Sequence, residues 1–145
     1  MLGDLRYGRT VHSLSQALDR FNAKLFFISP EILAMPSYVT DELKNHWSTH
    51  RNINEVLSEL DVLYVTRIQR ERFPDIEDYK EVAGAYKIDA ELLRKAKPEL
   101  KIMHPLPRVN EISTDVDKTK HAAYFRQAFN GVPVRMAILE KLLEG

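Results

Sequence analysis

Arginine and glutamine side chains follow short apolar runs at three separate places in this chain. Arg9 lies in the stretch GDLRYGRT, Arg67 and Gln69 come after the apolar run DVLYVT, and Arg108 ends the stretch HPLPR. A guanidinium is a planar fork that can bind a carboxylate through two hydrogen bonds. Two separate arginine forks, without candidate metal ligands beside them, predict a binding site for a small dicarboxylate.

The stretch GDLRYGRT, residues 3–10, differs by one residue from the phosphate-binding loop G-x-x-x-x-G-K-[ST]. In nucleotide-binding proteins that loop follows a complete strand and uses lysine as a compact point charge. Here only Met1 and Leu2 precede the first glycine, and arginine replaces the lysine. We therefore interpret the stretch as a helix N-terminus that attracts an anion together with Arg9. The alternative is an Arg9 side chain that lies solvated on the helix surface.

The spacing of apolar residues predicts strands that alternate with helices. Strands are expected at residues 25–29, 47–50, 61–66 and 101–105, with an edge strand at 85–88. Helices are expected at residues 8–21, 37–45, 52–60, 76–82, 90–97, 119–129 and 132–144, the last two separated by Asn130-Gly131. This alternation predicts an α/β fold: a mostly parallel, Rossmann-like sheet with helices on both faces and a truncated first strand.

Composition excludes several classes of function. The 145 residues include 21 basic and 21 acidic side chains, which argues against a general nucleic-acid binder. The chain has no cysteine, so disulfides, thiolate catalysis and zinc-thiolate sites are excluded. No apolar run approaches the roughly 18–20 residues that a membrane helix needs. We expect a soluble, cytoplasmic single domain that contacts no membrane and uses neither a metal nor a cofactor.

The three polar stretches are expected to meet at one edge of the sheet. In open α/β sheets, ligands bind in the crevice outside the carboxyl ends of the strands. Each stretch also has a purely structural explanation: two prolines stiffen HPLPR, and Arg67 could form a surface ion pair with Glu71 or Glu77. Their coincidence at three strand ends favours a binding site over three unrelated surface features.

Four stretches resemble a known family. GDLRYGRTVHSL, LYVTRIQRERF, HPLPRVNEI and DVDKTKHAAYFRQAFNGVPVRMAIL resemble, in this order, the C-terminal half of aspartate carbamoyltransferase catalytic chains. The related ornithine enzymes carry a cysteine in the loop equivalent to HPLPR, so this chain resembles the aspartate branch more closely. The resemblance implies that residues 1–145 form the aspartate-binding domain of a transferase of pyrimidine biosynthesis. That enzyme joins carbamoyl phosphate to the amine of L-aspartate.

The resemblance also implies roles for individual residues. Arg9, and Arg67 together with Gln69, are expected to hold the two carboxylates of aspartate. The backbone carbonyl of Leu106 is expected to orient the attacking amine, and the Leu106–Pro107 peptide is expected to be cis.

A second set of residues resembles the parts of the family that close over aspartate. Arg72, Glu77 and Tyr79 resemble a mobile loop, and Arg6 and Tyr7 resemble its partners in a neighbouring chain or domain. The resemblance further implies a catalytic homotrimer, and it leaves association with regulatory chains open.

The carbamoyl phosphate half of the family site has no counterpart in this sequence. That half carries a Ser-Thr-Arg-Thr-Arg motif, and no S-T-R-T run occurs here. Among the histidines, His12 is expected to pack, His104 to fix its loop and His121 to lie at the surface, while His46 and His50 share i,i+4 spacing without a glutamate between them. We expect the chain to be inactive by itself and to need the missing carbamoyl phosphate domain. The alternative is a stand-alone or engineered binding domain that reuses the fold.

Overall fold

Four strands and three isolated bridges form a parallel sheet in the computed structural model, which describes residues 1–144. The strands are β1 (Leu25–Ile28), β2 (Trp47–His50), β3 (Val62–Tyr64) and β4 (Lys101–Met103). Strand β1 pairs with β2, and β3 pairs with β4, in parallel register. Leu2 forms parallel bridges to Ile28 and to Val65, and it thereby joins the two pairs into one sheet.

Leu2 occupies the place of a first strand at the centre of the sheet. Its N–H donates to the carbonyl of Tyr64 at 2.8 Å, and its own carbonyl accepts from the N–H of Thr66 at 2.8 Å. On the far side of β4, Ile102 forms a parallel bridge to Ala122. The order across the sheet is β2, β1, Leu2, β3, β4, Ala122, which is the 3-2-1-4-5-6 order of the Rossmann fold. The predicted α/β class with a truncated first strand is confirmed.

Successive strand residues point to opposite faces of the sheet, and each face has its own hydrophobic core. Leu25 and Phe27 pack on one face, in a cluster with Leu5, Val11 and residues near 35–39. Phe26 and Ile28 pack on the other face, in a larger cluster with Leu63, Val65, Ile102 and Tyr124. Because both faces are covered at the centre of the sheet, β1 reads as a continuous apolar run, whereas β2 at the edge is more polar and more exposed.

The described residues contain five α-helices, and three of them have seven residues or fewer. The five helices are α1 (Arg9–Asp19), α2 (Ser37–Thr40), α3 (Ile76–Val82), α4 (Ala90–Leu93) and α5 (Tyr124–Glu144), with 3₁₀ turns at 31–33, 53–55, 57–59, 70–72 and 114–118. The prediction of a helix at 37–45 was too long, since α2 ends at Thr40, and its N-cap is Pro36. The segment predicted as a helix at 52–60 consists of two 3₁₀ turns. The edge strand expected at 85–88 reduces to one bridge between Ile88 and Ile112.

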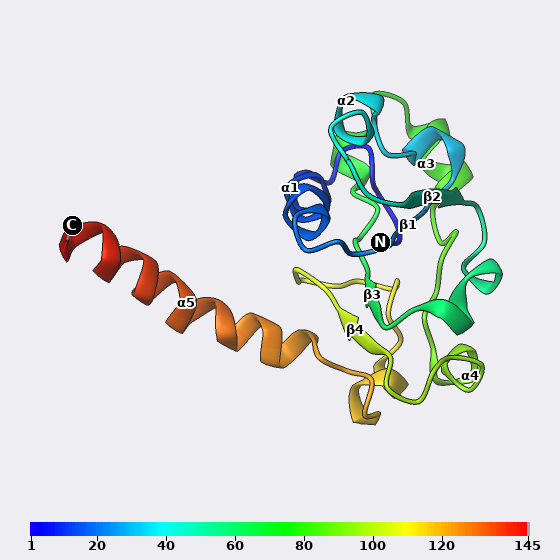
Figure 1. Cartoon of the computed structure of the whole chain (residues 1–145). Coiled ribbons are helices and arrows are strands. Elements are labelled where there is room, and N and C mark those ends of the chain that lie inside the picture. The colour runs from blue at the N-terminus through cyan, green and yellow to red at the C-terminus, as the bar shows by residue number, and fades with distance from the viewer. Residues whose placement is uncertain (145) are drawn as a thin grey trace.

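The prediction of two closing helices was wrong, because α5 is a single helix through Asn130, Gly131 and Pro133. Good helical sequence on both sides lets the helix propagate across the weak turn, and propagation is easier than a new nucleation. Arg135 Nη1 also donates to the carbonyl of Gly131 at 2.9 Å, so a side chain from the following turn contacts the backbone of the weak turn. Figure 1 shows α5 projecting away from the sheet with the C-terminus at its tip. No helix within residues 1–144 is long and apolar enough to cross a membrane.

Candidate functional site

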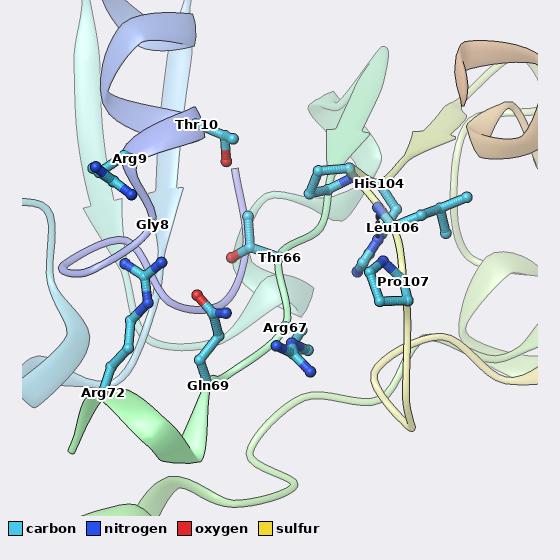
Figure 2. Close-up of a pocket in the computed structure, with 11 residues that line it drawn as sticks. Gly8, Arg9, Thr10, Thr66, Arg67, Gln69, Arg72, His104, Leu106 and Pro107 are labelled. Atoms are coloured by element: carbon cyan, nitrogen blue, oxygen red, sulfur yellow. Dashed lines mark hydrogen bonds between the residues drawn. The ribbon is translucent and has the colours of Figure 1, made fainter. Parts of the chain in front are cut away.

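A cavity of about 260 Å³ lies at the carboxyl ends of the central strands. Its walls come from three segments far apart in the sequence: residues 8–10, residues 66–72 and residues 104–107. Figure 2 shows Arg9 and Arg72 on one side of the cavity, Leu106 and Pro107 on the other, and Arg67 and Gln69 between them. All five residues predicted to bind substrate therefore line one cavity, at the point where the strand order reverses.

Two glycines in GDLRYGRT allow the close packing that forms the cavity floor. Gly3 has φ +117°, and a Cβ on it would lie 2.2 Å from the carbonyl oxygen of Thr66. A Cβ on Gly8 would lie 2.4 Å from the carbonyl oxygen of Asp4. The spacing of these glycines is therefore explained by backbone contacts. No phosphate-binding role is needed to account for it.

Arg9 is the first residue of α1, so it stands at a helix N-terminus, where the first backbone N–H groups have no partner within the helix. It takes part in none of the ion pairs formed within residues 1–144. Its charge and the positive end of the helix dipole therefore add in the same direction. This corner of the cavity attracts an anion.

Glu71 orients both polar side chains that follow β3. Arg67 Nη2 donates to Glu71 Oε1 at 2.7 Å, and Gln69 Nε2 donates to the same oxygen at 3.2 Å. The ion pair considered for Arg67 thus exists, yet Arg67 still lines the cavity. A hydrogen bond from the Glu71 backbone, the charge of Arg67 and a hydrogen bond from Gln69 hold the pKa of the Glu71 carboxyl below its ordinary value. Glu71 is therefore ionised, and its carboxylate holds the side chains of Arg67 and Gln69 in the cavity wall.

Arg72 brings a third guanidinium into the cavity. Its Nη1 donates to the backbone carbonyl of Tyr7, which ties the loop after β3 to the loop after Leu2. The same two loops are joined by an aromatic contact, with the ring centroids of Tyr7 and Phe73 5.9 Å apart. Phe73 also contacts Tyr79, at 5.6 Å between centroids.

The other residues predicted for loop closure lie outside the cavity lining. Glu77 pairs with Lys80 at 2.7 Å and is exposed. Arg6 donates to the carbonyl of Ile32 at 3.3 Å, and its guanidinium lies over the Tyr7 ring. Their role in closure remains a prediction, since only Arg72 of that set lines the cavity.

His104 fixes the backbone of the loop that carries Leu106. Its Nδ1 accepts a hydrogen bond from the Leu106 N–H at 2.8 Å, so the ring proton lies on Nε2, which donates to Glu111 Oε1 at 2.8 Å. The Leu106–Pro107 peptide is cis, and Leu106 has φ +55°. Gln127 on α5 accepts from the His104 backbone N–H at 2.9 Å. The side chains of His104 and Gln127 therefore both fix the backbone of this loop.

Arg108 does not reach the cavity, and the expectation that it would is wrong. Its guanidinium forms a two-pronged pair with the Asp117 carboxylate, and Nη1 also donates to the Tyr124 hydroxyl at 3.1 Å. The Arg108 hydrogen bond and charge hold the pKa of Asp117 below its ordinary value. Burial and the Asp117 carboxylate raise the pKa of Tyr124 to about 12. An internal carboxylate therefore satisfies Arg108 and turns it toward α5.

His121 was expected at the surface but is buried, and its Nδ1 donates to the carbonyl of Leu100 at 2.8 Å. His121 is buried because the next residue, Ala122, forms the bridge that extends the sheet. One polar residue in the sequence gives no indication that its neighbour pairs with a strand. Thr66 is a cavity residue that sequence reasoning missed. Its Oγ1 donates to the carbonyl of Leu2 at 3.2 Å. Its position directly before Arg67, at a strand end, was the available signal.

Comparison with known proteins gives one consistent family. The family model for the aspartate/ornithine carbamoyltransferase Asp/Orn binding domain matches residues 1–142. The chain is 57% identical over 143 residues to the aspartate carbamoyltransferase catalytic subunit of Thermococcus kodakarensis, covering 96% of this chain and 46% of that protein. It is 58% identical over 147 residues to the corresponding subunit of Halorubrum lacusprofundi, covering 99% of this chain and 47% of that protein.

Solved structures agree with the sequence relatives. The catalytic subunit of M. jannaschii aspartate transcarbamoylase superposes with a TM-score of 0.89 at 48% identity, covering 99% of this chain and 48% of that one. The aspartate transcarbamoylase of Trypanosoma cruzi in complex with carbamoyl phosphate and aspartate superposes with a TM-score of 0.88 at 42% identity, covering 95% and 47%. The chain spans about half the length of the curated relatives it matches. It belongs to the aspartate/ornithine carbamoyltransferase family and matches the domain of that family that binds aspartate or ornithine.

Proposed function

We propose that the cavity binds L-aspartate. The observation that carries the proposal is the charge of the lining: Arg9, Arg67 and Arg72 all contribute guanidinium groups. Among the described residues that line the cavity, none is acidic. Two carboxylates of one small ligand can each meet a guanidinium fork, and Gln69 adds an amide.

The same lining favours aspartate over ornithine, the other ligand class of the family. The side chain of ornithine ends in an ammonium group, which three guanidinium groups would repel. The side chain of aspartate ends in a carboxylate, which they attract. A cavity of about 260 Å³ suits a small ligand of this kind rather than a larger molecule.

In the complete protein, we infer that aspartate bound here is carbamoylated by carbamoyl phosphate. The amine nitrogen attacks the carbamoyl carbon, the bond from that carbon to the phosphate oxygen breaks, and phosphate leaves. The Leu106 carbonyl, on the loop held by His104, would accept a hydrogen bond from the amine and aim its lone pair. The product, carbamoyl aspartate, places the complete enzyme in pyrimidine biosynthesis.

The partners proposed for this domain follow from the same reading. A carbamoyl phosphate domain would supply the phosphate-binding and carbonyl-polarising groups that this sequence lacks. Arg72, Glu77 and Tyr79, with Arg6 and Tyr7, would close over bound aspartate. We propose a catalytic homotrimer as the assembly of the complete enzyme.

Titration of the ¹⁵N-labelled chain with small ligands tests the proposed ligand. L-Aspartate and succinate should shift the backbone amide signals of residues 8–10, 66–72 and 104–107 in a saturable way. L-Ornithine and L-alanine, each added at the same ionic strength, should leave those signals unchanged, because neither offers two carboxylates. Equal shifts with all four ligands, or shifts outside these three segments, would contradict the proposal.

A further inference from the structure

A Ser–His–Glu array lies on β2 and on the turn that follows it, and none of its three residues lines the arginine cavity. Ser48 and His50 are two residues apart on the strand, so their side chains point to the same face of the sheet. Ser48 Oγ lies 2.8 Å from His50 Nε2, and His50 Nδ1 lies 2.9 Å from Glu55 Oε2. The sequence offered no glutamate between His46 and His50, but the turn after the strand supplies one.

The proton positions in this array follow from the chemistry of Glu55. The hydrogen bond from His50 holds the pKa of the Glu55 carboxyl below its ordinary value, so the group is an ionised acceptor. His50 Nδ1 must therefore carry the ring proton. In the neutral ring Nε2 is bare, and it accepts the hydrogen bond from Ser48 Oγ–H. A hydroxyl nucleophile, a bare imidazole nitrogen and an orienting carboxylate are the parts that activate serine in acyl transfer.

Two members of the array, Glu55 and His50, are each held by a further contact. Glu55 closes a capping box: its Oε1 accepts from the Asn52 N–H at 3.1 Å, while its Oε2 faces His50. The His50 ring packs against Phe26, with 5.7 Å between ring centroids. The base and its orienting carboxylate are therefore positioned before any ligand arrives, as nucleophilic catalysis requires.

Ser48 is also accessible. It is half-buried and lines an open depression of about 550 Å³ together with Lys24, Asn45 and Trp47. The carbonyls of His46 and His50 accept hydrogen bonds from the backbone N–H groups of Leu25 and Ser29, so both carbonyls point toward the β1 side of the strand.

Alternation along β2 therefore directs the N–H of Thr49 toward the outer edge of the sheet. In the described residues, β2 pairs with β1 alone, so that edge is unpaired. In α/β-hydrolases the N–H of the residue after the nucleophilic serine donates to the developing oxyanion, and the Thr49 N–H would take this part here.

We propose that Ser48, His50 and Glu55 form a nucleophilic site that accepts an acyl group from small aryl esters. Ser48 Oγ attacks the ester carbonyl carbon while its proton passes to His50 Nε2. The bond from that carbon to the aryl oxygen breaks, and His50 returns the proton to the leaving aryl oxide. The products are acyl-Ser48 and a phenol. An aryl oxide is a weak base that leaves readily, which makes aryl esters the acyl donors suited to this site; the Trp47 ring packs against Phe27 on the opposite face of the sheet.

Single-turnover labelling with p-nitrophenyl acetate, followed by peptide mapping, tests this site in the chain itself. Ser13 is the internal reference, because it is exposed on α1 and its Oγ contacts backbone carbonyls only. Ser48 should be acetylated at least about tenfold faster than Ser13, since general-base assistance contributes roughly 10²–10⁴-fold to such reactions. Labelling of Ser48 at the rate of Ser13 would show that its hydroxyl has a structural role only.

Two variants separate activation from folding. His50→Gln removes the base and should reduce Ser48 acetylation to the Ser13 rate. Glu55→Gln keeps an acceptor for Asn52, because glutamine also serves in a capping box, but it removes the charge that fixes the His50 tautomer. It should slow Ser48 acetylation by about tenfold or more, with an unchanged thermal unfolding midpoint. Unchanged Ser48 labelling in either folded variant would overturn the proposal.

Discussion

His104 Nε2 donates a hydrogen bond to Glu111 Oε1 at 2.8 Å, and the His104 side chain is 1% exposed. Glu111 accepts further hydrogen bonds from the backbone N–H groups of Val109, at 3.2 Å, and Asn110, at 3.1 Å. One carboxylate therefore links the histidine that holds Leu106 to the backbone that follows the loop. This relationship makes the geometry of one cavity wall depend on the ionisation of a residue outside the cavity.

Replacing Glu111 with Gln should make stability less dependent on pH. Burial by itself would raise the pKa of the Glu111 carboxyl, but hydrogen bonds from His104 and from the backbone outweigh burial and hold it below its ordinary value. A depressed folded pKa gives stability that is present above the unfolded pKa and is lost as pH falls through the folded pKa. Glu111→Gln should therefore cost about 1.5–3 kcal/mol near neutral pH. The difference from the unsubstituted chain should shrink below pH ~4.5.

Urea unfolding at a series of pH values measures this difference in the free energy of unfolding. The matched control is Glu99→Gln, because Glu99 is exposed and its only ion pair in the described residues, with Lys120, is long at 3.7 Å. A constant difference between Glu111→Gln and the unsubstituted chain from neutral to acid pH would contradict the expected linkage.

Arg9→Lys and Arg67→Lys should each weaken the binding of a dicarboxylate. Lysine keeps the positive charge but cannot reproduce the planar two-pronged geometry. A hydrogen bond to a charged group is worth about 1.5–3 kcal/mol, and each variant should lose a comparable amount of binding free energy. Titration with L-aspartate measures the loss in this chain, and aspartate saturation measures it in the complete enzyme.

The control for these two variants is Arg70→Lys. Arg70 lies on the same loop but is exposed and does not line the cavity. The Arg70→Lys variant should bind L-aspartate with the same affinity as the unsubstituted chain. If Arg9→Lys or Arg67→Lys behaved like Arg70→Lys, that arginine would not hold a carboxylate.

The chain alone should form no more carbamoyl aspartate than buffer does. Its sequence lacks the Ser-Thr-Arg-Thr-Arg motif, so nothing positions the leaving phosphate or stabilises its charge. A steady-state assay with carbamoyl phosphate and L-aspartate, without added metal, measures this. Turnover that scales with the concentration of pure chain would show that electrophile activation is present after all.

Helix α5 should cause the chain to self-associate. Val132, Met136, Leu139 and Leu143 lie at helical spacing on one side of α5, and all four are exposed, Leu143 at 87%. Contiguous exposed apolar area of this kind promotes association. Sedimentation over a hundredfold range of concentration should show a dimer at the upper end.

The double variant Met136→Gln, Leu139→Gln should lower the dimer fraction, whereas Glu140→Gln, on an exposed polar position of the same helix, should leave it unchanged. A chain that stays monomeric over the whole concentration range would contradict this prediction, because α5 would then contact no second copy. Amide exchange on residues 132–143 distinguishes an associated helix from a frayed one, because only the former is protected.

The sequence by itself determined the four strands, the parallel sheet and the place of the cavity. Alternating apolar runs and polar strand ends are local patterns, and the carboxyl ends of parallel strands meet at one edge whatever the details of packing. For that reason Arg9, Arg67, Gln69, Leu106 and Pro107 could be predicted to lie together, and they line one cavity.

Only the tertiary structure decided which partner each polar side chain meets. Arg108 looked equivalent to Arg67 in sequence, but Asp117 and Tyr124 capture it, and no local pattern encodes that contact. His50 meets Glu55 because the chain turns after β2, and α5 continues through Gly131 because helix propagation outweighs two poor residues. Each outcome depends on which of several possible contacts is most favourable in three dimensions. The spacing of residues in the sequence shows which side chains are available, but not which of them meet.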